Sequence, residues 1–272
     1  MVETCQRWNR VTPPDGPTFE PQRAESYIRS TRARLFLLVL LVVSGSLIAS
    51  GCGGDDEDSG QASTPAASTE RQSDTPSLTE AEAEELATSM LLRLTDFPTG
   101  WRAQPSEDEE GCAGVEELTE RYDALAKVDS DDFVHGEATQ VGSGAALFND
   151  EETGREALNY LEGAIQSEEF EDCLNDYLSE QADENVTFGD VQVGQVSFPS
   201  LGDRSSAWEV AIPAESQGFS ITAYVDAVYI LESNALSAIV FTDVASPPDE
   251  QMREDLSRLV AQRMGEAVDE IP

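Results

Sequence analysis

Hydrophobic and polar residues alternate in the second half of the chain in a way that predicts a sheet. From Val186 onward apolar side chains recur at about every second position, first over 191–196 and then over 208–212. The alternation is strongest over 219–229, and a Glu-Ser-Asn turn leads from there into 236–244. We expect these last two segments to form a β-hairpin with one face buried.

Helical spacing precedes and follows the predicted sheet. A capping box at Thr79 opens a helix that runs to about Leu92. Apolar residues spaced by three and four predict a helix around 158–165 and a second one around 170–178, arranged as a helical hairpin or as one bent helix. Another amphipathic helix over 252–264 closes the chain.

In the first half of the predicted domain the spacing of apolar residues is less regular. Trp101 starts an extended segment after a Pro- and Gly-containing turn, and a short helix is expected from Val115 to about Leu125. Strand-like sequence follows over 133–139 and over 141–148, where Asn149 is expected to stop the strand and to cap the next helix. The elements together predict an α+β fold, with a mainly antiparallel sheet packed by helices on one side.

The pattern also divides the chain into parts. Residues 1–51 are expected to be an N-terminal extension and signal peptide, and 52–77 a disordered linker that is first acidic and then rich in Ser, Thr and Pro. Residues 78–272 form the one predicted folded domain, which is long enough for a proper core.

The chain is strongly acidic, with 54 Asp and Glu against 16 Lys and Arg and a net charge of −38. Residues 1–51 hold 4 of the acidic and 6 of the basic residues, which leaves 50 acidic against 10 basic residues from Cys52 onward. Such a surface repels anions, so no nucleic-acid partner is expected. We interpret the charge as a solvated surface, the alternative being a cationic partner.

The N-terminal part has the features of an export signal. Three arginines, Arg29, Arg32 and Arg34, precede an apolar run over 35–48. As a helix this run is roughly 21 Å long at about 1.5 Å per residue, short of the ~30 Å hydrocarbon core, so a permanent membrane span is disfavoured against a cleaved signal.

The run ends in Ala49-Ser50-Gly51-Cys52, which resembles the lipobox of bacterial lipoproteins. That resemblance implies cleavage before Cys52 and a diacylglycerol on its thiol, although the family usually has Leu where this chain has Ala49. The expected location is therefore the outer face of the cell membrane, with acyl chains as the anchor and the linker as a tether.

Two cysteines, Cys112 and Cys173, lie in the predicted domain. Export would place them in an oxidising compartment, where thiols pair. A disulfide between them is therefore the simplest interpretation. Free thiols, or a redox or metal role, are the alternatives.

No set of residues in the predicted domain forms a recognisable catalytic or metal site. His135 is the only histidine, Gly142-Ser143-Gly144 lacks the spacing of a nucleophile elbow, and zinc, EF-hand and phosphate-loop patterns are absent. We therefore expect a protein without catalytic activity, metal or cofactor. An enzyme would need His135 or an acidic pair such as Glu209 and Asp226.

Large aromatic side chains could line a ligand groove, although aromatics in alternating strands are usually part of a core. Tyr224 is the preferred groove residue because it lies on the mixed face of its strand, and Trp101 is the second candidate.

From Leu91 to the end the chain resembles a broad class of actinobacterial lipoproteins and secreted proteins, and distantly the extracellular sensor domain of mycobacterial-type serine/threonine kinases. The resemblance is carried by residues 91–101, Cys112, Cys173-Leu174, 223–229 and 238–241. It implies an α+β domain facing the envelope that binds an unidentified ligand in a groove between sheet and helices. Those sensor domains typically have two disulfides, whereas this chain can form one in the domain, and no binding residue carries over.

These observations predict a non-enzymatic ligand-binding or sensor-like module of the cell envelope, anchored by lipid, with an unknown envelope ligand or protein as partner. The alternatives are an envelope hydrolase and a structural partner of another envelope protein.

Overall fold

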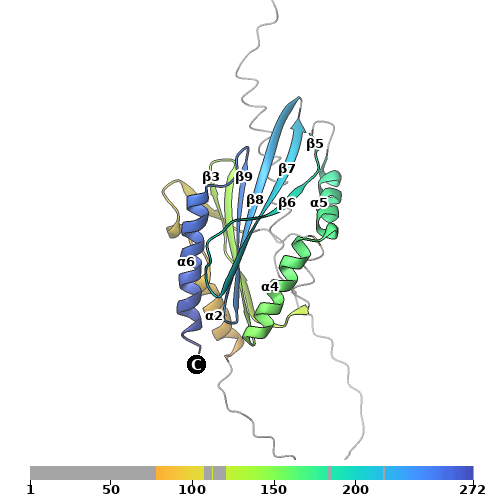
Figure 1. Ribbon diagram of the computed structural model, residues 1–272. Coiled ribbons are helices and arrows are strands. Elements are labelled where there is room, and N and C mark those ends of the chain that lie inside the picture. The colour runs from red at the N-terminus through yellow and green to blue at the C-terminus, as the bar shows by residue number, and fades with distance from the viewer. Residues whose placement is uncertain (1–77, 107–111, 113–120, 183–185, 217, 272) are drawn as a thin grey trace, which may run out of the picture.

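The computed structural model describes residues 78–106, 112, 121–182, 186–216 and 218–271. Within these residues nine strands form one antiparallel sheet on which helices pack (Figure 1). The predicted α+β class, a mainly antiparallel sheet packed by helices, is confirmed. The helices cover both faces of the sheet, whereas the sequence had suggested one.

The sheet has the order β1-β3-β4-β9-β8-β7-β5, with β2 paired to β4 beside β3 and β6 paired to β7 beside β5. The strands are β1 (Trp101–Gln104), β2 (Ala124–Asp129), β3 (Asp132–His135), β4 (Thr139–Phe148), β5 (Val186–Phe188), β6 (Gln192–Val196), β7 (Arg204–Ser216), β8 (Phe219–Glu232) and β9 (Ala235–Val244). The predicted hairpin is the β8–β9 pair, and it lies at the centre of the sheet.

Both faces of this hairpin are buried in its inner half, contrary to the expectation of one buried face. Residues 227–231 of β8 are Ala-Val-Tyr-Ile-Leu, an unbroken apolar run whose side chains point alternately to opposite faces. Val228 and Ile230 pack in one core cluster, and Ala227 and Tyr229 in another on the opposite face. A continuous apolar run of this kind indicates burial on both sides.

The helices are α2 (Glu80–Met90), α4 (Glu151–Ile165), α5 (Glu168–Gln181) and α6 (Glu250–Val268), with a short 3₁₀ turn η1 (Leu94–Asp96). The predicted capping box is present, since the Thr79 amide donates to Glu82 Oε2 over 2.8 Å and the Glu82 amide donates to Thr79 Oγ1 over 3.3 Å. In Figure 1, α5 rises from the end of α4 at an angle, so these two form a bent succession and not a hairpin.

One local prediction was wrong and another misplaced the end of a helix. Asp150 caps α4 through the Thr153 amide, while Asn149 donates its side-chain amide to the Asp123 carbonyl. The helix expected to reach about Leu125 ends earlier, since Arg121 is helical and β2 begins at Ala124; most of the predicted helical span lies outside the described residues. Propensity favoured a helix there, and pairing with β4 overrides it.

The core has two layers, one on each face of the sheet. The first lies under α2 and α6 and includes Met90, Phe241 and Val260. On the other face α4 and α5 cover two clusters, one around Leu158 and Trp208 and one around Leu174 and Ile212. The chain of aromatic contacts from Phe97 to Trp101 and Phe133 extends the first layer toward β1, with ring centroids 4.6 and 4.7 Å apart.

Candidate functional site

The two predicted groove residues, Trp101 and Tyr224, lie in one row across the sheet. Trp101 faces His135 of β3, His135 faces Thr139 of β4, and Asp243 of β9 faces Tyr224 of β8. The Thr139 hydroxyl donates to Asp243 Oδ2 over 2.8 Å, which links the two halves of the row. All five side chains therefore share the face on which α6 packs.

The structure does not bring these two aromatic residues together. Four strand spacings separate β1 from β8, and at ~4.8 Å each the two residues stand about 19 Å apart. Trp101 instead stacks on His135, with ring centroids 5.4 Å apart. Burial raises the pKa of Asp243, while the hydrogen bond from Thr139 opposes that rise. Trp101 and Tyr224 therefore lie on one face of the sheet but apart from each other, and a groove role for either stays a prediction.

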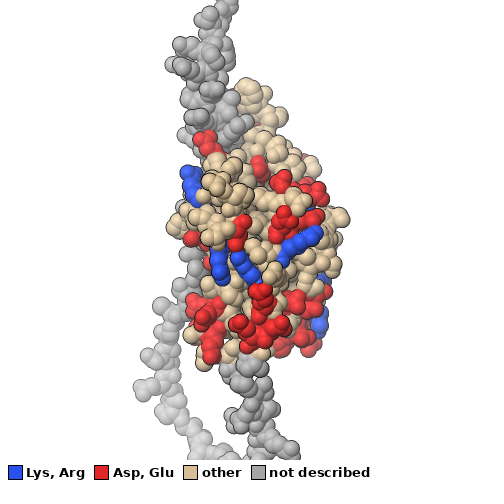
Figure 2. Space-filling view, turned by 90° about the vertical axis from the view of Figure 1, so that its left-hand side faces the viewer, with Lys and Arg blue, Asp and Glu red and all other residues tan. Residues whose placement is uncertain are grey.

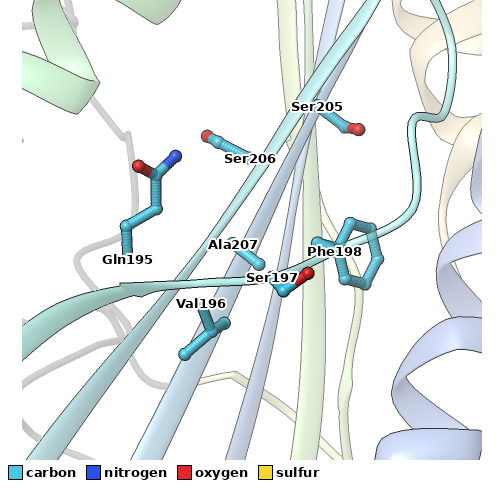
Figure 3. A pocket seen from close by; sticks show the side chains of 7 residues that line it. All are labelled: Gln195, Val196, Ser197, Phe198, Ser205, Ser206 and Ala207. Carbon is cyan, nitrogen blue, oxygen red and sulfur yellow. The ribbon is translucent and has the colours of Figure 1, made fainter.

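A hollow opens elsewhere, at the point where β6 leaves β7. The two strands pair from Gln192 with Ala211 to Val196 with Ala207. Beyond Ala207, no described strand pairs with residues 204–206 on the side opposite β8. The diverging strands leave an open hollow of about 400 Å³ at this fork (Figure 3). It is lined by Gln195, Val196, Ser197, Phe198, Ser205, Ser206 and Ala207.

The loop that closes this fork, residues 197–203, is held in place by defined contacts. The Ser205 hydroxyl accepts from the Leu201 amide and donates to the Pro199 carbonyl, both over 3.0 Å. The Asp203 amide donates to the Leu231 carbonyl over 2.9 Å. Since Leu201 also packs against the core under α6, the hollow is formed in advance of any ligand.

The polar side chains of the hollow are amide and hydroxyl groups. In Figure 3 the Gln195 amide and the Ser206 hydroxyl point toward each other from neighbouring strands. Ser206 is only 4% exposed, and its Oγ has no hydrogen-bond partner among the described residues. Trp208 lies two residues further along the same face, directly opposite Gln195, and its indole Nε1 is also buried without a described partner. Buried polar atoms of this kind call for a bound water or ligand.

Charged groups near the hollow are engaged elsewhere. Arg204 precedes the lining residues on β7, and its guanidinium binds Glu162 and Asn159 of α4. None of the lining residues carries a charge. The hollow therefore presents mainly polar, hydrogen-bonding surface without a net charge of its own.

The acidic pair named from the sequence is adjacent in space. Glu209 of β7 lies directly opposite Asp226 of β8. The Asp226 side chain is fully buried and forms an ion pair with Arg253 of α6. Burial raises the pKa of Asp226, and the neighbouring Arg253 offsets only part of that rise. This carboxylate is thus committed to the contact between sheet and helix.

The structure contains the predicted disulfide between Cys112 and Cys173, which joins residue 112 to α5 with the two Cα atoms 5.7 Å apart. The lipobox residues Ala49, Ser50, Gly51 and Cys52 lie outside the described residues. No described helix is long and apolar enough to cross a membrane.

The described surface is acidic and offers no grouping of metal ligands. Figure 2 shows acidic side chains gathered over the lower end of the molecule, where α2 and the C-terminal part of α6 lie. Exposed carboxylates there include Glu80, Glu82, Glu84, Glu85, Glu266, Asp269 and Glu270. Among the described residues no group of three or more His, Cys, Asp or Glu side chains could hold a metal ion.

The sequence did not point to any residue of the hollow. Gln195, Ser197 and Ser206 resemble ordinary polar residues of exposed strands and loops. Their importance depends on where β6 separates from β7, which no local pattern reveals. The one available signal was the Pro- and Gly-containing stretch 197–203, which marks a long loop inside an otherwise regular hairpin.

No protein-family model matches the chain, and a search of curated proteins found no match. Among solved structures, the extracellular domain of PknH from Mycobacterium tuberculosis is similar at a TM-score of 0.38 and 12% identity, covering 69% of this chain and 97% of that one. LpqN, involved in cell envelope biogenesis of Mycobacterium tuberculosis, is similar at a TM-score of 0.24 and 14% identity, covering 61% and 77%. The chain thus resembles these two mycobacterial proteins at a distance, and no residue role is transferred from either.

Proposed function

We propose that this chain is an extracytoplasmic lipoprotein, anchored to the outer face of the membrane through Cys52, whose folded domain is a non-enzymatic binding module. The single observation that carries the binding role is the preformed hollow at the β6–β7 fork. It combines a volume of about 400 Å³ with a buried, unpartnered hydroxyl on Ser206. Volumes of roughly 300–1,000 Å³ with a few convergent polar groups are typical of small-ligand sites.

The proposed location is supported by the export signal, the lipobox resemblance and the disulfide. Disulfides persist in oxidising compartments and are rare in the cytosol. The Cys112–Cys173 bond therefore agrees with a domain that functions outside the cytoplasm.

Intact-mass analysis of the native product from the membrane fraction tests the anchor. The expected chain starts at Cys52 and carries a diacylglycerol on the thiol. Cys52→Ala should leave the uncleaved, unlipidated precursor, while Cys5→Ala, which alters the other N-terminal cysteine, should not change the product. A wild-type chain that keeps its leader, or that lacks lipid at Cys52, would show the proposed anchor to be wrong.

A binding module is favoured over a hydrolase because the candidate catalytic residues are engaged in contacts within the fold. Asp226 is paired with Arg253 inside the fold, and His135 stacks on Trp101 at the opposite edge of the sheet. No described cavity places these two groups beside a common substrate position. A catalytic acid or base must reach the proton that it transfers.

The alternative of a structural partner would require a large exposed apolar patch. Among the described residues the exposed large hydrophobic side chains are Leu94 and Phe219, at 43% and 71%. They lie in η1 and at the start of β8, so they do not form one patch. The hollow therefore supports ligand binding better than the exposed apolar residues support a structural partner.

Native mass spectrometry of the mature chain, purified from its own envelope, tests the binding role. A retained small molecule is expected in the wild type. Ser197→Trp, which fills the hollow from an exposed lining position, should lose that mass, while Ser200→Trp on the same loop should keep it. Retention by both variants would place the ligand elsewhere. Turnover of ester, peptide or glycoside substrates that one point mutation abolishes would overturn the non-enzymatic assignment.

A further inference from the structure

We infer that the outer edge of β6 is a self-association surface, on which a second copy of this chain adds its own β6 in antiparallel pairing about Gly194. The contact is made by main-chain groups of the strand edge, and it is separate from the binding role proposed above.

The edge of β6 lacks the features by which exposed strand edges usually avoid pairing. Charged side chains, proline and bulges block such pairing in other proteins. Among the described edge strands, β1 contains Arg102 and is followed by Pro105, and β2 contains Lys127 and an irregularity at its start. Residues 191–202 carry no charged side chain, and β6 contains no proline. In Figure 1, β6 lies in front of β7 and β8 with no described element in front of it, so its outer edge is open to another strand.

Two residues of β6, Val193 and Gln195, direct their main-chain N–H and C=O groups away from β7. The Gly189 amide donates to the Pro213 carbonyl over 2.8 Å, so the Pro213 carbonyl points to the side on which β5 and β6 lie. Main-chain groups alternate in direction along a strand, so every second residue of β7 from Pro213 down to Ala207 points the same way. The β6 residues opposite these positions are Gln192, Gly194 and Val196. The residues between them therefore point outward.

The outward groups are bounded at both ends of the strand. The Val191 amide already donates to Asn175 Oδ1 of α5 over 3.4 Å, and β6 ends at Val196. No described residue bonds to the outward groups of Val193 or Gln195. A strand that adds to this edge is thus limited to pairing with these two residues.

This pair of residues is self-complementary about Gly194. Antiparallel pairing centred there sets Val193 opposite Gln195 of the second copy and Gln195 opposite its Val193, and each opposed pair exchanges two hydrogen bonds. Gly194 then meets Gly194 of the second copy, with about 4.5 Å between the Cα atoms. Nothing lies within 4 Å of a Cβ built at Gly194, so no side chain obstructs this approach. A register centred on Val193 would instead need the Val191 amide, which is already bonded.

Charge favours a second copy over a basic peptide at this edge. A cationic peptide would find no carboxylate along residues 191–202. Two copies would not oppose like charges there either, because Asp190, the nearest acid along the chain, falls opposite Phe198 in this register. The net charge of −38 makes two copies repel at a distance. That repulsion is screened beyond about 8 Å at physiological ionic strength and beyond about 3 Å at 1 M, so pairing should strengthen as salt rises.

Disulfide cross-linking of the mature chain tests the register, with the wild type as the control for native thiols. Gly194→Cys should form a covalent dimer under a mild oxidant, because a Cα separation of about 4.5 Å lies within the range of a disulfide. Gln195→Cys should not, because the two copies of that position are diagonal neighbours about 7–8 Å apart. Ser200→Cys, on the exposed neighbouring loop, measures random collision. Cross-linking at position 194 should be on the order of tenfold faster than at either control.

Two variants in the Gly194→Cys background separate main-chain pairing from side-chain contact. Gln195→Pro removes an outward N–H and should abolish the cross-link, whereas Gln195→Ala should keep it. The Gln195 amide makes no bond to β7, so both variants should unfold in urea near the midpoint of Gly194→Cys. The comparison of positions 194, 195 and 200 uses no proline, so it decides the register even where Gln195→Pro unfolds the domain.

Sedimentation equilibrium of the wild type at low and high salt gives an independent readout, in which the dimer fraction should rise with salt. Equal cross-linking rates at positions 194, 195 and 200 would overturn the inference, as would a dimer that folded Gln195→Pro leaves intact. A dimer that dissociates as salt rises would mean a contact between charged surfaces and would also overturn it. Binding of the synthetic peptide Lys-Val-Thr-Val-Lys by a monomeric chain, lost in Gln195→Pro, would assign the edge to a basic peptide in place of a second copy.

Discussion

Asp226 of β8 and Arg253 of α6 form an ion pair buried between the sheet and the helix that covers it. The exposed fractions of the two side chains are 0% and 11%. Asp226 Oδ1 and Arg253 Nε have no further partner among the described residues. The pair fixes the first turns of α6 over the centre of the sheet, but it leaves part of the cost of burying charge uncompensated.

Replacing Arg253 by Met should destabilise the domain by about 3–5 kcal/mol at neutral pH, because it leaves the Asp226 carboxylate buried without a counterion. Burial already raises the pKa of Asp226, and loss of Arg253 removes the main opposing influence. A group whose pKa is raised on folding favours the fold while it is protonated and disfavours it as pH rises through the folded pKa. The loss should therefore shrink on acidification, beginning above the ordinary Asp range near pH 4.

Urea unfolding as a function of pH measures this effect. The double variant Asp226→Asn, Arg253→Met buries no charge and should recover most of the lost stability at neutral pH. A loss in Arg253→Met that stayed constant with pH would contradict the assignment of the effect to Asp226.

Arg263→Met tests a pair with the opposite behaviour. Two Arg263 nitrogens donate to the two Asp96 carboxylate oxygens over 2.8 Å, and one of them also donates to the Leu91 carbonyl over 2.7 Å. Burial alone would raise the pKa of Asp96, but the hydrogen bonds from Arg263 and from the Arg93 amide lower it overall.

Such a lowered pKa contributes stability above the unfolded value, and that stability is lost as pH falls through the folded pKa. Arg263→Met should therefore cost about 1.5–3 kcal/mol at neutral pH. The difference from the wild type should persist to lower pH than that of Arg253→Met. The same urea series compares the two, and a reversed order of their pH dependence would contradict the pKa directions assigned to the two acids.

Local signals were enough to predict much of this fold. The capping box at Thr79, the helices around Leu158 and Leu174, and the β8–β9 hairpin all follow from spacings within a few residues. Where long-range pairing decides the structure, those signals failed. Ala124 lies in β2 because β4 offers it a partner. The unbroken apolar run 227–231 indicates that both faces of the sheet are buried, and the expectation of helices on one side did not take this run into account.

The candidate site could not be predicted from local sequence patterns either, because it also depends on long-range strand pairing. The pattern placed Trp101 and Tyr224 correctly on strands, but alternation does not give the order of strands in a sheet, and their separation depends on that order. Ser206 became notable only because its partner strand ends at Val196. Disulfide pairing was predictable, since Cys112 and Cys173 were the only cysteines of the domain.

Removing the disulfide should lower stability by up to about 4 kcal/mol in the chain-entropy model, because the bond spans a sequence separation of 61 residues. Cys112→Ser with Cys173→Ser avoids leaving a free thiol and is the variant to measure by urea unfolding. A reductant should destabilise the wild type to a similar extent and leave the double variant unaffected. Equal stability of oxidised and reduced wild type would contradict a structural role for the bond.

Gly202, in the loop that closes the fork, should not tolerate a side chain. Its φ is +59°, and an added Cβ would lie 2.5 Å from the Leu231 carbonyl oxygen, a main-chain atom that cannot move aside. The left-handed conformation alone costs of order 1–3 kcal/mol for a residue with a side chain. Gly218 provides the matched control, since its φ of +82° is also positive but nothing lies within 4 Å of a Cβ built there.

Gly218→Ala should therefore lose only the stability that the left-handed backbone conformation costs. Gly202→Ala should lose more, because its Cβ also clashes with the Leu231 carbonyl oxygen. Because the loop 197–203 carries Ser197 and Phe198, which line the hollow, Gly202→Ala should also reduce retention of the native ligand in mass spectrometry, while Gly218→Ala should not. Urea unfolding of the two variants beside the wild type gives the comparison. Equal losses of stability, or a ligand retained in full by Gly202→Ala, would mean that the loop adjusts freely and does not shape the hollow.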